Sequence, residues 1–274
     1  MNIGPRALGA GLRGVIRFIG RGGGYHAAAL TYYSIFSLFP AVALAYALLG
    51  IVGAESVIND AVDALERRNV EPQFVDALSD TMTSAVNQRS DDATIVVVIS
   101  VASAIYLASR WVRGVARGLD AVLDHEHAGS GLRFLRRLRD TLVLVLLFIG
   151  ALVLLFVGTG LAKDLFGEAL SLLWEVGVYL LAALLAVGAY AYIYWFAPSP
   201  PRPPPDGLLA GAMIGMLIWV LATVGFRIFA DLWPGYDTNY GVFATALVAV
   251  IWLSLTNVSV LLGGAFAAEW SRTM

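Results

Sequence analysis

Few residues of this chain are of types that carry out chemistry by themselves. The sequence contains three histidines and no cysteine, which excludes a thiol nucleophile and a thiolate metal site. His125 and His127 alternate with Asp124 and Glu126, and such a set can hold a metal ion, but a solvated charged loop accounts for it equally well. No phosphate-binding glycine loop, zinc-protease helix or nucleophile elbow is present. We therefore assign no catalytic residue, metal or cofactor and expect a protein that is not an enzyme.

Other polar side chains are set into long apolar segments. In ALTYYSIFSLFPAVALAYALLG, the hydroxyl groups of Tyr32, Tyr33 and Ser37 interrupt an apolar run, and Tyr33 and Ser37 share one helical face. Pro40 has no amide to bond to Phe36, so we expect a kink there. A kinked, hydroxyl-rich helix could line a polar cavity. Alternatively, these hydroxyl groups lie near the inner membrane interface and bond to neighbouring helices.

Three further polar residues lie in or beside the last two apolar segments. Asn257 is the most polar side chain at the centre of any segment. Because an unpaired amide in lipid is costly, we expect it to point inward and find a partner. Arg227, one helical turn from Asp231, can reach the outer interface or face a central cavity. Glu269 follows at the inner end of the last segment. All three join the candidate cavity-lining residues.

Glycines mark a second kind of candidate position. Gly207, Gly211 and Gly215 are spaced four apart in the fifth apolar segment, and Gly263 and Gly264 lie in the sixth. Small residues on one helical face let two helices approach closely in a membrane. We therefore predict that these glycines serve helix packing rather than ligand contact.

Six apolar segments must position these residues. A helix rises about 1.5 Å per residue, so about 20 residues cross a hydrocarbon layer of about 30 Å. Spans are predicted at residues 27–52, 93–111, 141–162, 176–197, 208–230 and 242–268. Charged residues make up only 14% of the chain, whereas soluble proteins carry about 25%. The predicted fold class is all-α: a polytopic membrane protein in which residues 1–274 form a single six-helix membrane domain.

The charges between the spans alternate in sign and predict the orientation. With both termini in the cytoplasm, 13 of the 18 Lys and Arg residues lie inside, as the excess of basic residues in cytoplasmic loops requires. Five of the seven tryptophans also fall at predicted span ends, where an indole favours the interface; Trp219 and Trp252 fall mid-span and are expected to pack. We predict a multi-pass protein of the plasma (inner) membrane.

Two long connections have amphipathic patterns of their own. Residues 53–92 show two apolar stripes at helical spacing with an acidic outer face, which predicts an external helical cap. The inner connection, from Arg110 through Arg139, combines an apolar stripe with arginines and predicts a surface-lying segment attracted to anionic lipid headgroups. A basic cytoplasmic loop explains these arginines without nucleic acid, which we do not predict as a partner. Membrane lipids are the expected partners.

Two motifs carry a resemblance to a known family. The first-span segment TYYSIFSLFPAVALAYALLG and the terminal YDTNYGVFATALVAVIWLSLTNVSVLLGGAF resemble the YihY/virulence factor BrkB family. The likeness covers essentially the whole chain, including WVRGVARGLDAVLD after the second span. The resemblance implies a six-span inner-membrane protein of undefined molecular activity, from a family once mislabelled ribonuclease BN. Residues that match the two motifs are Tyr32, Ser37, Pro40, Tyr236, Tyr240, Gly241, Trp252, Leu262 and Gly263.

The same resemblance adds two candidates and shows one departure. Tyr236 and Tyr240 join the candidate cavity-lining residues because they match the second motif. The family continues LLG with a small residue and then Glu, whereas Gly264 and Ala265 stand here. Glu269 lies one helical turn later and could substitute from the same face.

Two functions fit these features. The first is transport, or handling of a lipid or other amphiphile, through a polar intramembrane cavity bounded by the first, fifth and sixth spans. The alternative is a non-transporting membrane scaffold that supports envelope integrity, with a fully packed core. A ribonuclease is disfavoured because the metal-ligand-rich signature of zinc phosphodiesterases is absent.

The predicted orientation can be tested with reporter fusions. Fusions after Met274 and within residues 110–140 are expected to give a cytoplasmic signal, and fusions within residues 53–92 an external one, because the Lys and Arg excess sets the topology. Paired reporters that are active on opposite sides of the membrane measure this. An external signal from residues 110–140 would contradict the whole arrangement.

Overall fold

The computed structural model describes residues 3–52, 93–125, 133–231 and 242–272, and this part of the chain contains helices and no strand. It divides into two compact units. One comprises residues 1–34 and 109–274, and the other comprises residues 35–108, within their described parts. The first unit holds the candidate sites below. Residues 53–92, the predicted external cap, lie outside the described residues.

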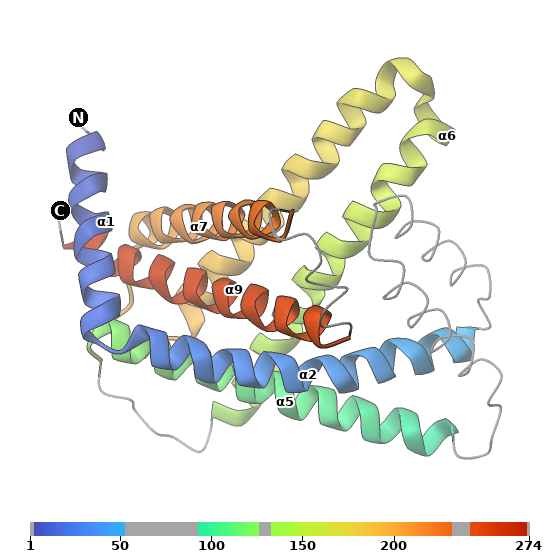
Figure 1. Cartoon of the computed structure of the whole chain (residues 1–274), viewed down its shortest axis with the longest axis horizontal. Helices are drawn as coiled ribbons and strands as arrows, with labels where there is room; N and C mark the ends of the chain where they lie inside the picture. Colours follow the sequence, from blue (N-terminus) through green and yellow to red (C-terminus); the bar gives the residue numbers. More distant parts are fainter. Residues whose placement is uncertain (1–2, 53–92, 126–132, 232–241, 273–274) are drawn as a thin grey trace. The chain divides into compact units, whose positions relative to one another are not determined.

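Helix α1 (Ile3–Gly20) and helix α2 (Gly23–Val52) meet at a glycine turn (Figure 1). Gly22 has a φ of +68°, in the left-handed region that suits glycine. Its amide donates to the Ile19 carbonyl at 3.2 Å, which closes α1. Helix α2 then runs without a break through Pro40, so the expected loss of one amide does not end the helix there.

Helix α5 (Ala93–Leu123) is longer than the predicted second span. We expected that span to end near Trp111 and a surface-lying segment to follow. Instead one helix continues, because no glycine–proline break follows and Val115, Leu119 and Val122 find partners in the core. The apolar stripe expected at the membrane surface therefore packs into the protein. Contact of the nearby arginines with anionic lipid stays a prediction.

Helix α6 (Arg133–Phe196) covers the regions predicted as the third and fourth spans. Its ribbon reverses direction near the middle, so that two arms run back alongside each other (Figure 1). The Tyr192 hydroxyl of the second arm donates to Asp140 Oδ1 of the first at 2.9 Å. Asp140 is buried, and this bond joins the two arms.

A buried carboxylate holds the proline-rich connection between α6 and helix α7 (Pro205–Asp231). Asp120 on α5 accepts hydrogen bonds from the Ser199 amide at 2.6 Å and the Ser199 hydroxyl at 3.0 Å. Helix α7 starts at Pro205 with Asp206 in its first turn, residues that favour a helix N-terminus. The connection is thus tied to the body of the first unit.

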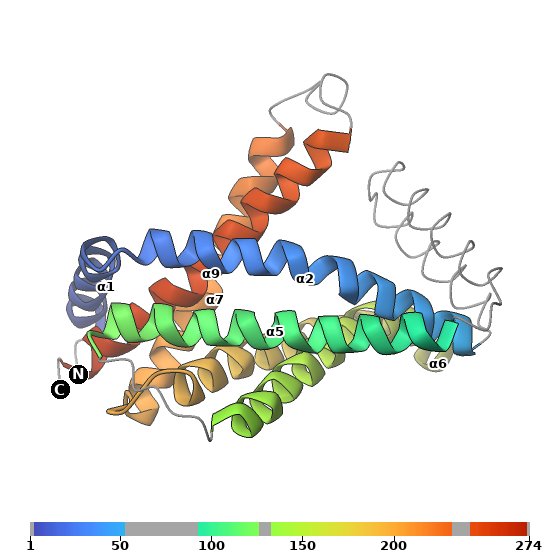
Figure 2. The same ribbon diagram turned by 90° about the horizontal axis from the view of Figure 1, so that it is seen from below.

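Helix α7 lies beside helix α9 (Val242–Ser271), as both views show (Figures 1 and 2). A Cβ built on Gly211 would lie 2.5 Å from the Ala267 Cβ and 2.7 Å from the Gly263 carbonyl oxygen. One on Gly263 would lie 2.8 Å from the Gly211 carbonyl oxygen. At these positions only hydrogen fits between the two backbones.

The other predicted packing glycines also face neighbours. A Cβ on Gly207 would meet Ser271, and one on Gly215 would meet Tyr190 and Tyr194, each under 3.0 Å. A Cβ on Gly264 would lie 2.3 Å from the Leu119 side chain of α5. Helix α9 therefore contacts α7 on one side and α5 on another through positions that lack side chains.

Three helices of the described part are long and apolar enough to cross a membrane: Val176–Phe196, Pro205–Phe229 and Leu247–Ser271. They overlap the predicted spans at residues 176–197, 208–230 and 242–268. Large apolar side chains on these segments are exposed, among them Leu184, Leu221 and Ile251. Helices with such surfaces are suited to lipid rather than water.

Replacing Gly211 with Leu is expected to destabilise the bundle by about 1–3 kcal/mol, because the side chain would push against the α9 backbone rather than a movable side chain. Thermal unfolding of the purified protein in detergent measures this. Gly225 on the same helix is the matched control, since a Cβ there meets nothing within 4 Å. Equal unfolding temperatures for G211L and G225L would contradict the assigned contact.

Candidate functional site

Asn257 joins three helices through its side-chain amide. Its Oδ1 accepts the indole N–H of Trp111 on α5 at 3.1 Å. Its Nδ2 lies 3.3 Å from both the Thr31 and Ser34 hydroxyl oxygens on α2, and 2.9 Å from the Leu253 carbonyl oxygen on α9 itself. We call Thr31, Ser34, Trp111 and Asn257 the Asn257 cluster.

The two hydroxyl groups are oriented to accept from Asn257. Thr31 donates its own proton to the Ala27 carbonyl at 2.8 Å, and Ser34 donates to the Leu30 carbonyl at 3.0 Å. Their oxygens therefore remain as acceptors for the amide N–H groups. Asn257 is 1% exposed. The cluster supplies hydrogen-bond partners for this buried side-chain amide, which we expected from the sequence to point inward and find a partner.

A cation and an aromatic ring lie close to this cluster. The Arg110 guanidinium sits 5.5 Å from the centre of the Tyr33 ring, within the range of a cation–π contact. Both side chains are half-buried, and Arg110 is the residue before Trp111. Tyr32, which is exposed, meets the Tyr33 ring edge-on at 5.7 Å. A charged group and several hydroxyl groups thus gather where α2, α5 and α9 meet.

The two mid-span tryptophans pack between α7 and α9. Trp219 donates to the Thr256 hydroxyl at 3.1 Å, and Trp252 donates to the Thr223 hydroxyl at 3.3 Å. Their rings meet edge-on, with centres 6.1 Å apart. This reciprocal arrangement gives both residues the packing role expected for them.

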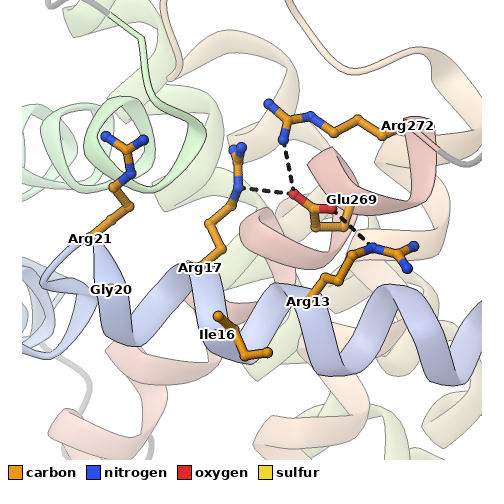
Figure 3. Close-up of a pocket in the computed structure, with 7 residues that line it drawn as sticks. All are labelled: Arg13, Ile16, Arg17, Gly20, Arg21, Glu269 and Arg272. Carbon is orange, nitrogen blue, oxygen red and sulfur yellow. Dashed lines mark hydrogen bonds and ion pairs between the residues drawn. The ribbon is translucent and has the colours of Figure 1, made fainter.

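Glu269 forms a second polar centre near the end of α9 (Figure 3). Its carboxylate accepts from Arg17 Nε at 2.9 Å and from Arg13 Nε and Arg272 Nη1 at 3.3 Å each. The Glu269 side chain is 7% exposed. Three guanidinium groups on α1 and the C-terminal segment therefore surround one buried carboxylate, which we call the Glu269 cluster.

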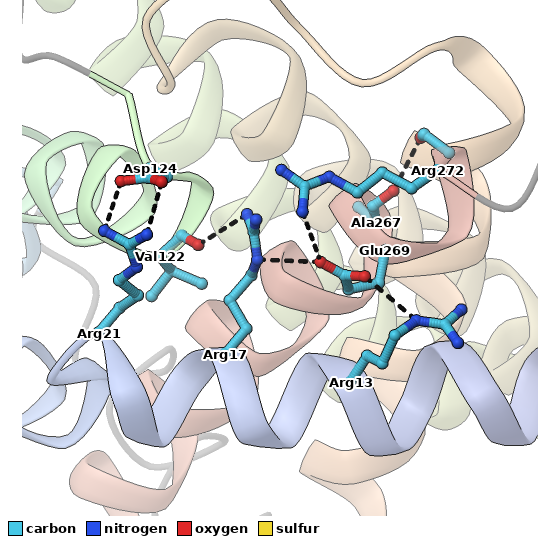
Figure 4. A network of polar contacts seen from close by, with 9 residues as sticks. Arg13, Arg17, Arg21, Val122, Asp124, Ala267, Glu269 and Arg272 are labelled. Atoms are coloured by element: carbon cyan, nitrogen blue, oxygen red, sulfur yellow. Dashed lines mark hydrogen bonds and ion pairs between the residues drawn. The ribbon is translucent and has the colours of Figure 1, made fainter.

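The Glu269 cluster extends to the end of α5 (Figure 4). Arg17 Nη1 donates to the Val122 carbonyl at 3.1 Å, and Arg21 makes a two-pronged ion pair with Asp124. Burial lowers the pKa of Arg17, and the charge of Arg272 lowers it further, whereas Glu269 raises it. An arginine stays protonated at any physiological pH, so Arg17 is a permanent cation here.

An open depression of about 390 Å³ lies over this cluster (Figure 3). Its lining includes Ile16 and Glu269 together with arginines from both ends of the chain, namely Arg13, Arg17, Arg21 and Arg272. Guanidinium groups in such a setting bind phosphate and carboxylate groups.

The remaining predicted residues are not members of these two clusters. Ser37 and Pro40 are in the second unit, where Ser37 is half-buried. Arg227 is exposed on α7. Tyr236 and Tyr240 lie outside the described residues, as does His127. Within the described part, no group of three histidine, aspartate or glutamate side chains is placed to hold a metal ion.

Sequence reasoning missed most partners of both centres. By sequence, Arg13 and Arg17 are two of the 13 basic residues predicted on the cytoplasmic side, and Trp111 is one of the five tryptophans at predicted span ends. One available signal was the spacing of Arg13, Arg17 and Arg21, four residues apart and opposite the apolar residues of the same segment. For Arg110, the signal was a charge directly at the end of an apolar run.

Curated relatives of this chain are membrane proteins. A UPF0761 membrane protein of Pseudomonas paraeruginosa is 25% identical over 256 residues, covering 90% of this chain and 59% of that protein. A UPF0761 membrane protein of Azotobacter vinelandii is 25% identical over 267 residues, covering 94% of this chain and 62% of that protein. Inner membrane protein YhjD of Escherichia coli is 26% identical over 234 residues, covering 79% and 66%.

The chain therefore spans less than two thirds of the length of the first two relatives. No solved structure shows significant similarity to it. Residues 16–274 match the family described as Virulence factor BrkB, which confirms the resemblance carried by the two apolar motifs. This match covers most of the chain, including the Asn257 cluster and every member of the Glu269 cluster except Arg13, and the chain belongs to the virulence factor BrkB family.

Proposed function

We propose that this chain is a six-span inner-membrane protein, with both termini in the cytoplasm, that handles an amphiphile within the membrane. The observation that carries the proposal is the Arg110–Tyr33 pair beside the Asn257 cluster. A cation, an aromatic ring and hydroxyl groups are contributed here by neighbouring positions of α2 and α5. Ionisable groups at membrane depth are expensive and mark binding sites or pathways.

An amphiphile suits this chemistry better than a small ion. Arg110 and the Tyr33 hydroxyl can bind a polar or anionic head, and the surrounding apolar side chains can contact a hydrocarbon tail. Ser37 lies one helical turn beyond Tyr33 on α2 and extends the same hydroxyl-bearing face. The proposal assigns no catalytic step, metal or cofactor.

A scaffold is the second candidate, and one observation favours it. Asn257 is buried, and each of its polar atoms already has a protein partner. Such a cluster holds α2, α5 and α9 together without needing a ligand. In this alternative the core is solid and the outer and inner faces serve as docking surfaces.

Cysteine accessibility separates the two functions. Single cysteines at positions 33, 37, 227 and 257 are introduced into a chain that has none of its own, and a small hydrophilic thiol reagent is applied to intact membranes. If a polar cavity is present, positions 33, 37 and 257 are expected to react, because water reaches them. Labelling is measured by mass shift.

The control is position 219, where the indole packs against α9 and should stay unlabelled in either case. Labelling confined to position 227 would contradict the cavity and leave the scaffold. Labelling at both 37 and 257 would contradict a solid core.

A further inference from the structure

Helix α1 has two faces of opposite character. Leu8, Leu12 and Ile19 are 78%, 66% and 70% exposed, although each is a large apolar residue. Arg13 and Arg17 lie on the other side of the helix and face Glu269 (Figure 4). An apolar face opposite a basic face is typical of helices that lie in the plane of a membrane interface.

The packing of α1 leaves its apolar face outward. Ala10 is fully buried, and a Cβ built on Gly14 would lie 3.4 Å from the Phe266 backbone of α9. Small residues therefore form the contact with α9, while the large apolar residues point away from it. The Glu269 ion pairs lock this orientation.

The cluster carries more positive than negative charge. Its three arginines face the single carboxylate of Glu269, so two positive charges are in excess, and the neighbouring Arg21–Asp124 pair adds no net charge. Arg13 and Arg272 are its accessible members, with side chains 48% and 59% exposed, whereas Arg21, also 48% exposed, is held in its ion pair with Asp124. Arg13 contacts Glu269 through Nε, and its terminal nitrogens point away from the carboxylate (Figure 3).

The cluster also lies at the right level for a lipid headgroup. The apolar segment of α9 that is suited to cross a membrane ends at Ser271, beside Glu269 and Arg272. Ile16, which is 61% exposed, lines the same depression as the arginines. A phosphate held by the guanidinium groups would therefore have apolar surface next to it.

We propose that the Glu269 cluster binds the headgroup phosphate of an anionic glycerophospholipid, with Arg13 and Arg272 on the phosphate and Ile16 and Leu12 against the lipid chains. A soluble phosphate compound would use the arginines but leave the exposed apolar face of α1 in water. A phospholipid can contact the arginines through its phosphate and the apolar face of α1 through its chains.

Lipid binding to the purified 274-residue chain tests the proposal. The delipidated protein in detergent is titrated with phosphatidylglycerol or phosphatidylcholine, and bound lipid is counted by native mass spectrometry. Phosphatidylglycerol is expected to bind more tightly than phosphatidylcholine. R13Q and R272Q should each weaken phosphatidylglycerol binding about tenfold, because each removes a charged donor to the phosphate, and R272K should retain most of it.

R202Q is the matched control. Arg202 is exposed and lies in the proline-rich connection, where its guanidinium stacks over Trp195 at 5.3 Å. This variant removes one arginine outside the cluster and should leave the affinity within about twofold. If R13Q detaches α1 and lowers the unfolding temperature, R272Q decides the question, because the Arg272 side chain is largely exposed.

The apolar half of the site has its own test. I16N should weaken phosphatidylglycerol binding, and excess glycerol phosphate should compete poorly. Strong competition by glycerol phosphate together with an unaffected I16N would assign the site to a soluble phosphate compound and overturn the proposal. Equal binding of the two lipids, or an equal loss in R202Q and R272Q, would also overturn it.

Discussion

Lipid tails are as apolar as leucine, so burial of apolar surface does not hold two helices together inside a membrane. Helices α7 and α9 are held instead by the close approach of their backbones at Gly211 and Gly263, where a Cβ would come within 2.8 Å of the facing carbonyl oxygen. Dispersion contacts at this distance require that no side chain intervene. With α9 fixed in this way, its other faces can present Asn257 and Glu269 to the remaining helices.

Asn257 and Glu269 are both buried on α9, but one is a neutral amide and the other a carboxylate. Asn257 and Glu269 are separated by twelve residues, about 18 Å of helix. The neutral amide lies at the apolar centre, where hydrogen bonds to Trp111, Thr31 and Ser34 offset its desolvation. The carboxylate lies near the helix end, among three arginines that compensate its charge. A charge costs more to bury than an amide, and the distribution along α9 follows that order.

The relatives named above are described as membrane proteins, and the chemistry of the two centres supports the proposals made for this chain. The polar atoms of Asn257 are already hydrogen-bonded within the protein. The groups beside it that could contact a ligand are Arg110 and Tyr33. The centre at Glu269 keeps positive charge in excess and borders an exposed apolar helix. Both arrangements suit a ligand with a charged head and an apolar tail, one inside the helical body and one at its end.

The sequence alone determined the class of the protein, because length and uninterrupted hydrophobicity suffice to predict a membrane helix. It also indicated that Gly211 faces another helix, because small residues on one face let helices approach closely. It indicated that Asn257 needs a partner, because an unpaired amide in lipid is costly. It could not name those partners. Trp111 and Arg13 lie 146 and 256 residues from theirs, and only the tertiary structure brings them together. Local pattern was also insufficient for α5, where core contacts of Leu119 extend a helix that we expected to end at Trp111. A periodic pattern shows that a face is apolar, and the fold decides whether protein or lipid covers it.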